Sequence, residues 1–146
     1  MANEREQLTQ PRFVHLNPDW NAEPNAPCVH LVAESDTVSV SFLLNPHAYD
    51  AEDGEVGKLT FPSCRRWRLD ATNDEGWFAG RGRFAGVAPA WGEFYEIVGD
   101  DPTMDALDWE PADGSGSRHF LFYFRDEAFE CLAGDWTLTR LPAPAA

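Results

Sequence analysis

The side chains best suited to chemistry are a polar triplet and a histidine that lie far apart in the chain. Asn73, Asp74 and Glu75 are consecutive, and His119 follows within a later apolar segment. Carboxylates beside an imidazole can act as general acid and base, so His119, Asp74 and Glu75 are the candidate catalytic residues of a small hydrolase or isomerase. Their oxygen atoms also suit a divalent cation, which is a second possible chemistry for the set.

Two more carboxylates follow His119 and extend this set. Asp126 and Glu130, together with Asn73, are candidate ligand-binding residues. An ordinary structural role competes with this function, because Asn and Asp open turns by bonding their own backbone and a Glu can lie on the wet face of a strand. Nothing in the sequence brings these groups together, so the structural role is favoured.

Histidine and cysteine spacing gives little support for a metal site. Cys28 and His30 form the one close pair, and alternate residues of a strand share a face. No second pair stands at zinc spacing, so we expect no metal ion and no other cofactor. The three cysteines, an odd number in apolar surroundings, are expected to be reduced and buried.

A basic cluster stands out in this acidic chain. Arg65, Arg66 and Arg68 surround Trp67, and a strand would place Arg66 and Arg68 on one face. They could bind an anion with help from the tryptophan ring, or pair across strands with acidic residues; the second is favoured. Gly80, Gly82 and Gly86 resemble a phosphate-binding loop only weakly, because no helix is expected after them.

The elements that must position these residues are strands. Residues 117–138 predict an apolar hairpin with a polar turn at residues 125–127. Its core-facing side chains are expected to be Phe120, Phe122, Phe124, Phe129 and Cys131. A second hairpin is expected over residues 28–44, where Val38, Val40 and Phe42 alternate with hydroxyl residues and face the core.

The whole pattern predicts a mainly β fold. About seven short strands, separated by turn signals, favour a single-domain antiparallel β-sandwich or partly closed barrel over residues 1–146. One short helix is expected at residues 103–108, after Asp101 and Pro102, whereas residues 70–86 are expected to form an irregular loop. Residues 1–11 and 142–146 are expected to be disordered.

Charge and composition exclude several classes of protein. The chain has 146 residues, a net charge of −14 and 13% aromatic residues. Such a charge repels nucleic acids and anionic membranes, so neither is an expected partner. No leader peptide or membrane span is recognisable, which predicts a cytoplasmic protein. The chain is expected to be a monomer or a homodimer.

The leading functional hypothesis is a non-catalytic domain that binds a basic protein or a small ligand. An acidic, aromatic-edged surface would form the contact, because opposite charge speeds encounter. An immunity-like or inhibitor-like role toward a basic protein is one form of this hypothesis. The remaining ligand-binding candidates are Trp91, Glu93 and Arg66.

The C-terminal hairpin also carries a resemblance. Residues 118–126, Arg-His-Phe-Leu-Phe-Tyr-Phe-Arg-Asp, and 129–133, Phe-Glu-Cys-Leu-Ala, resemble a hallmark of a family of uncharacterised bacterial proteins. In that family a cysteine, matched by Cys64, precedes an Asn-Asp-Glu triplet, matched by residues 73–75. A His-Pro pair usually follows the triplet, where this chain has Gly80, Arg81 and Gly82. The resemblance covers about the C-terminal half and implies a shared fold with no known activity.

Overall fold

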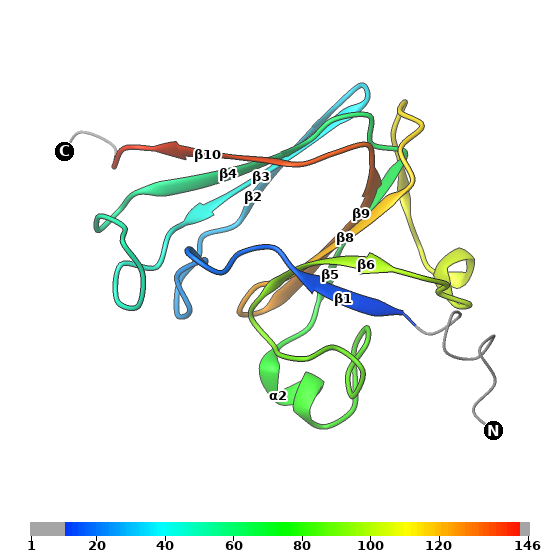
Figure 1. The fold of residues 1–146 in the computed structure, drawn as a ribbon, viewed down its shortest axis with the longest axis horizontal. Helices are drawn as coiled ribbons and strands as arrows, with labels where there is room; N and C mark the ends of the chain where they lie inside the picture. Colours follow the sequence, from blue (N-terminus) through cyan, green and yellow to red (C-terminus); the bar gives the residue numbers. More distant parts are fainter. Residues whose placement is uncertain (1–10, 144–146) are drawn as a thin grey trace.

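Two antiparallel sheets form the molecule, which a computed structural model describes over residues 11–143 (Figure 1). Within that range there are ten strands rather than about seven. One sheet has the order β1 (Arg12–His15), β6 (Phe94–Val98), β8 (Arg118–Tyr123), β9 (Glu127–Ala133), β5 (Arg66–Ala71) and β7 (Glu110–Pro111). The other has the order β10 (Thr137–Leu141), β4 (Val56–Phe61), β3 (Thr37–Leu43) and β2 (His30–Glu34). The mainly β, sandwich-like class is confirmed, and the sheets do not close into a barrel.

The main core lies between the two sheets, which are stacked in Figure 1. Strand β3 buries Val38, Val40 and Phe42 and leaves the intervening residues half-buried, as its alternation predicts. Facing it, β8 and β9 contribute phenylalanines, with the rings of Phe42 and Phe122 5.3 Å apart. Burying each such ring contributes roughly 1.5–3 kcal/mol. Both predicted hairpins are present as the pairs β2–β3 and β8–β9, and both contribute side chains to the core.

The opposite face of the six-stranded sheet has a smaller cluster. His119, Leu121 and Tyr123 alternate with the core phenylalanines of β8, so they point to this second face. A short helix, α2 (Asp74–Phe78), and the chain after it lie on this side, below the sheet in Figure 1. Trp77 of α2 is buried against the ring of Tyr123, at 6.0 Å.

The helix is therefore not where the sequence pattern predicted it. The Asn73 side chain accepts a hydrogen bond of 2.8 Å from the Gly76 amide, and two carboxylates in the first turn favour the helix dipole. Residues 103–108 contain only the 3₁₀ turn η1 (Met104–Ala106). There the Asp101 carboxylate accepts hydrogen bonds from the amide and the hydroxyl of Thr103, a local arrangement that favours a turn over a helix.

The cysteines agree with the predictions only in part. All three cysteines are free, and Cys64 and Cys131 are buried, but Cys28 is exposed because it lies in the loop before β2. The ends expected to be disordered, 1–11 and 142–146, fall outside the described residues except for Pro11, Pro142 and Ala143. Across residues 11–143, no helix has the length and apolar character needed to cross a membrane.

Candidate functional site

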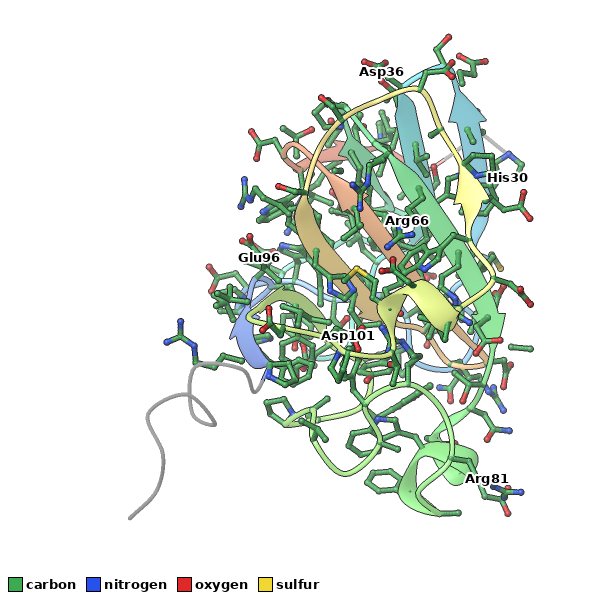
Figure 2. All side chains as sticks on the ribbon, turned by 90° about the vertical axis from the view of Figure 1, so that its right-hand side faces the viewer. His30, Asp36, Arg66, Arg81, Glu96 and Asp101 are labelled. Atoms are coloured by element: carbon green, nitrogen blue, oxygen red, sulfur yellow. The ribbon has the colours of Figure 1, made fainter. Side chains whose placement is uncertain are left out.

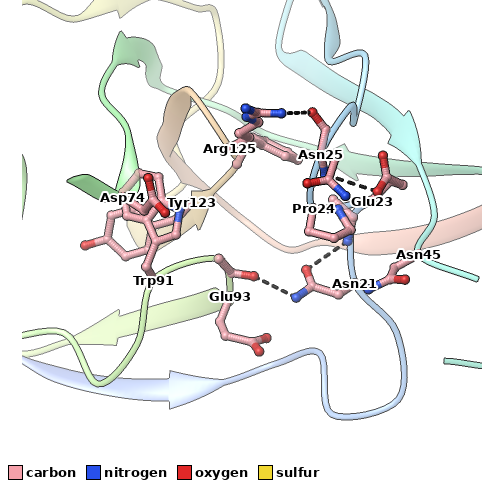
Figure 3. A pocket seen from close by; sticks show the side chains of 13 residues that line it. Asn21, Glu23, Pro24, Asn25, Asn45, Asp74, Trp91, Glu93, Tyr123 and Arg125 are labelled. Atoms are coloured by element: carbon pink, nitrogen blue, oxygen red, sulfur yellow. Dashed lines mark hydrogen bonds between the residues drawn. The ribbon is translucent and has the colours of Figure 1, made fainter. Parts of the chain in front are cut away.

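An open pocket of about 390 Å³ lies beside Trp91, and we call it the Trp91 pocket (Figure 3). One side is formed by Trp91, Tyr123 and Asp74, and the opposite side by the loop of residues 21–25. The Asn21 side chain crosses between these sides and donates a 2.7 Å hydrogen bond to the Gly92 carbonyl. This bond ties the loop to the segment that leads into β6.

The aromatic wall of the pocket is held from behind. The rings of Trp91 and Tyr123 are 4.7 Å apart, and Trp77 lies 6.2 Å from Trp91. The Tyr123 hydroxyl donates a 2.7 Å hydrogen bond to the Arg83 carbonyl. Burial raises the pKa of Tyr123, so this hydroxyl stays protonated and the wall stays neutral.

Carboxylates outnumber cationic groups in the described lining of the pocket. The lining includes three carboxylates, those of Glu23, Asp74 and Glu93, and one guanidinium, that of Arg125. Arg125 donates a 2.6 Å hydrogen bond to the Asn25 carbonyl, which directs its charge to the loop. The pocket therefore has an excess of negative charge.

Local hydrogen bonds orient each of these carboxylates. Glu23 accepts from the Ala26 amide at 2.6 Å, and Asp74 accepts from the Glu75 amide at 2.8 Å. The carboxylate of Glu93 lies 2.9 Å from the His15 ring nitrogen. A carboxylate has about four lone-pair sites, so all three retain capacity to bind a ligand.

The negative charge of Glu93 acts on its neighbours. Burial is the largest cause that raises the pKa of Tyr49 and of Tyr95, and the charge of Glu93 is the second. An anion stabilises the protonated, neutral form of a nearby phenol and would stabilise a cation in the same way. The electrostatic environment at this end of β6 therefore favours positive charge.

A second, separate group of polar residues is buried under the loops that cover the outer face of the six-stranded sheet, which is the face away from the main core. We call this group the Glu130 network. The Glu130 side chain is 1% exposed and accepts from His119 at 2.5 Å and from two nitrogens of Arg83 at 3.1 and 2.7 Å. Arg83 also contacts Asp101 and donates a 3.0 Å hydrogen bond to the Thr103 hydroxyl. The network thereby ties two loops, one after α2 and one before η1, to β8 and β9.

Both carboxylates of this network are held in their charged form. Burial alone would raise the pKa of Glu130, but the hydrogen bonds from His119 and Arg83 outweigh it and lower that pKa. In Asp101 burial is likewise outweighed by the bonds from Arg83 and Thr103, so its pKa is lowered too. The buried charges are thus compensated within the protein, which fits a structural role.

Part of this network has the composition of a metal site. Among the described residues, one group has ligand atoms close enough to hold an ion. It consists of Asp101, His119 and Glu130, whose ligand atoms all lie within 4.8 Å of one another. Arg83 binds both carboxylates of this group, so an ion would have to displace its guanidinium. The guanidinium of Arg83 already occupies the position that the ion would take.

The structure separates the catalytic candidates. His119 bonds Glu130, and the hydrogen bonds among residues 11–143 include none between His119 and Asp74 or Glu75. Asp74 lines the Trp91 pocket and Glu75 is exposed in the first turn of α2. The imidazole is thus part of the pair with Glu130, whereas Asp74 lines the Trp91 pocket.

The ligand-binding candidates also divide between places. Trp91 and Glu93 line the Trp91 pocket, and Glu130 is the centre of the buried network. Asn73 caps α2, and Asp126 is exposed in the turn between β8 and β9.

Arg66 has a structural environment on the face of β5 (Figure 2). Its guanidinium lies 2.9 Å from Asp105 and 4.9 Å from the centre of the Trp109 ring. This acidic partner lies in η1 and not on a neighbouring strand, so the expected pairing across strands does not hold for Arg66. Arg68, on the same face, lies 3.5 Å from Glu130 and so adds a second cation to the network.

Three of the important residues, Arg83, Asp101 and Tyr123, were not sequence candidates. Arg83 stands in a glycine-rich segment and Asp101 at the start of the expected helix, where neither type is unusual. The available signal was indirect: a glutamate on an apolar strand such as Glu130 requires a cationic partner if it is buried. Tyr123 gave no signal beyond its place among core phenylalanines.

Comparison with known proteins adds no relative to this description. No family model, no curated protein and no solved structure matches the chain. The resemblance of the C-terminal hairpin to an uncharacterised bacterial family therefore stays a prediction.

Proposed function

We propose that this chain is a non-catalytic binding domain that receives a cationic group in the Trp91 pocket. One observation supports this most: the lining of the pocket combines an aromatic wall and three carboxylates with a single guanidinium. A cation over the face of a Trp ring gains about 0.5–2 kcal/mol, and carboxylates add to the attraction. A basic protein side chain or a small amine would meet both features at once.

The charge of the whole chain supports the same partner class. A net charge of −14 attracts cations over a distance of about one Debye length and repels phosphate-rich partners. Trp91 and Glu93, both expected to bind a ligand, lie in the pocket wall. The cytoplasmic location and the choice between monomer and homodimer stay predictions.

A hydrolase or isomerase built on His119 has weaker support. The His119 side chain is 5% exposed, and its partner Glu130 is already bound to Arg83. A general base must come within about 2.6–3.2 Å of the proton that it removes. Substrate access would therefore require the loops over the Glu130 network to open.

A titration followed by NMR tests the proposed function. The probes are N-acetyl-arginine amide and its uncharged analogue N-acetyl-citrulline amide, added to the ¹⁵N-labelled protein. We expect the arginine probe to bind with Kd of about 1 mM, a strength of roughly 4 kcal/mol, and to shift the Trp91 indole and Gly92 amide signals. Equal binding of both probes, or shifts confined to other regions, would contradict the proposal.

Variants locate the binding site. Trp91→Ala should weaken binding of the arginine probe by about two- to thirtyfold, because it removes the cation–π contact. Asp74→Asn should weaken it by up to about fivefold, the effect of one exposed ion pair. Glu34→Gln is the matched control, since Glu34 is exposed on β2 of the other sheet. A similar loss in Glu34→Gln would show that overall charge, and not the pocket, determines binding.

A further inference from the structure

Phe78 is the one exposed phenylalanine among residues 11–143. Its exposed fraction is 73%, whereas the other phenylalanines are buried or half-buried. Phe78 is the last residue of α2 and so projects from the outer face of the molecule. Single exposed apolar side chains are common on protein surfaces, so its meaning depends on what surrounds it.

Phe78 lies next to the charged part of the Trp91 pocket. It stands four positions after Asp74, and residues at this spacing in a helix are neighbours on one face, about 5–6 Å apart at Cβ. Asp74 lines the pocket. An exposed aromatic ring and a pocket carboxylate are therefore presented by the same face of α2.

Aromatic contacts hold this ring in place relative to the pocket. The rings of Phe78 and Trp77 are 5.0 Å apart, and Trp77 is 6.2 Å from Trp91 in the pocket wall. Trp77 itself is buried. These contacts link the end of the helix to the pocket wall, and Phe78 is the exposed end of this row of rings.

We infer that the partner of this surface is a basic polypeptide, an inference that rests on the proposed cation-binding function. Its Lys or Arg side chain would enter the Trp91 pocket while an apolar side chain packs on Phe78. A small amine would fill the pocket and leave Phe78 in water, whereas a polypeptide covers both. Protein interfaces combine such aromatic anchors with a polar, charged surround, and the net charge of −14 attracts a basic chain.

The geometry restricts how the two partner residues are spaced. Asp74 and Phe78 are four positions apart on α2, a spacing that places Cβ atoms about 5–6 Å apart. Alternate residues of an extended chain are about 6.6–6.8 Å apart. Residues three or four positions apart on a helix are about 5–6 Å apart. The basic and the apolar residue should therefore be two apart in an extended partner, or three to four apart in a helical one.

Selection from a phage-displayed library of random peptides tests this inference. The full chain is the bait, and the selected peptides are expected to combine Lys or Arg with an apolar residue at one of these spacings. Fluorescence anisotropy then measures the Kd of the best labelled peptide. Phe78→Ser should weaken it about tenfold, the loss expected for an interface anchor. The control Val32→Ser, at an exposed apolar position on β2, should leave it unchanged.

Excess N-acetyl-arginine amide should displace the labelled peptide, because both would use the Trp91 pocket. Basic peptides that bind Phe78→Ser and Val32→Ser equally well would overturn the polypeptide inference and leave the cation pocket intact. A selection that enriches no peptide would overturn it as well. Peptides without basic residues, or equal binding to Asp74→Asn combined with Glu93→Gln, would overturn both proposals.

Discussion

Replacing Arg83 by methionine should cost much more stability than any exposed arginine. Arg83 binds Glu130 and Asp101, whose side chains are 1% and 3% exposed. Methionine leaves both buried carboxylates without this cation, and breaking a buried ion pair costs about 3–5 kcal/mol. For a chain of this length that loss lowers the Tm by roughly 10–15 °C.

Arg81→Met is the matched control for this substitution. Arg81 belongs to the same loop but is exposed, and Figure 2 shows it at the edge of the molecule. Its replacement should change the free energy of unfolding by less than about 0.5 kcal/mol. Urea unfolding of both variants and the wild type at about pH 7 measures the difference.

The deficit of Arg83→Met should also shrink in acid. In the wild type, hydrogen bonds lower the pKa of Glu130, so its folded form stays charged. Without Arg83 one of the groups that lower this pKa is lost, so the pKa of Glu130 is higher in the folded variant than in the folded wild type. The folded variant therefore binds a proton more readily and gains stability relative to the wild type as the pH falls. A loss below about 1 kcal/mol, a loss equal to that of Arg81→Met, or a deficit that is the same at about pH 7 and about pH 4.5 would refute the structural role of the network.

Three other outcomes are expected. The pKa values of Glu130 and Asp101 are both lowered on folding, so these charged groups stabilise the folded protein above their unfolded pKa values near pH 4. This contribution is lost as the pH falls further. Urea unfolding from about pH 7 to about pH 3 should show the free energy of unfolding decline, and a rise would contradict the prediction. Asn73→Ala removes the cap of α2 and should lower the free energy of unfolding by about 0.5–2 kcal/mol in the same assay. An unchanged free energy of unfolding would show that the cap does not stabilise the protein. Raising NaCl from about 0.05 M to about 0.5 M should weaken binding of the arginine probe but not of the citrulline probe, because salt screens exposed charges.

Much of the sheet structure could be predicted because its signals are local. The alternation at Val38, Val40 and Phe42 and at the phenylalanines of residues 120–124 determines which side chains face the core. Pro62, which cannot donate a hydrogen bond to a sheet, lies between β4 and β5, and these strands belong to different sheets. Helix α2 was missed although its cap signal is present, because five residues including a glycine give almost no helical periodicity.

The candidate sites were harder to predict because they depend on contacts between distant segments. Arg83 and Glu130 are 47 positions apart, and their pairing requires the loop after α2 to fold over the sheet. The wall formed by Trp91 and Tyr123 joins a loop residue to a strand residue that looked like core material. Residue type and strand alternation contain no information on how such loops return to the sheet.

The most direct test of the cation-binding proposal compares two ligands on two proteins. The ligands are N-acetyl-arginine amide and N-acetyl-citrulline amide, and the proteins are the wild type and the variant with Asp74→Asn and Glu93→Gln. NMR titration gives the four dissociation constants. The wild type should prefer the arginine probe by about fivefold or more, and this preference should approach one in the variant. An equal preference in both proteins would contradict the assignment of a cation site to the Trp91 pocket.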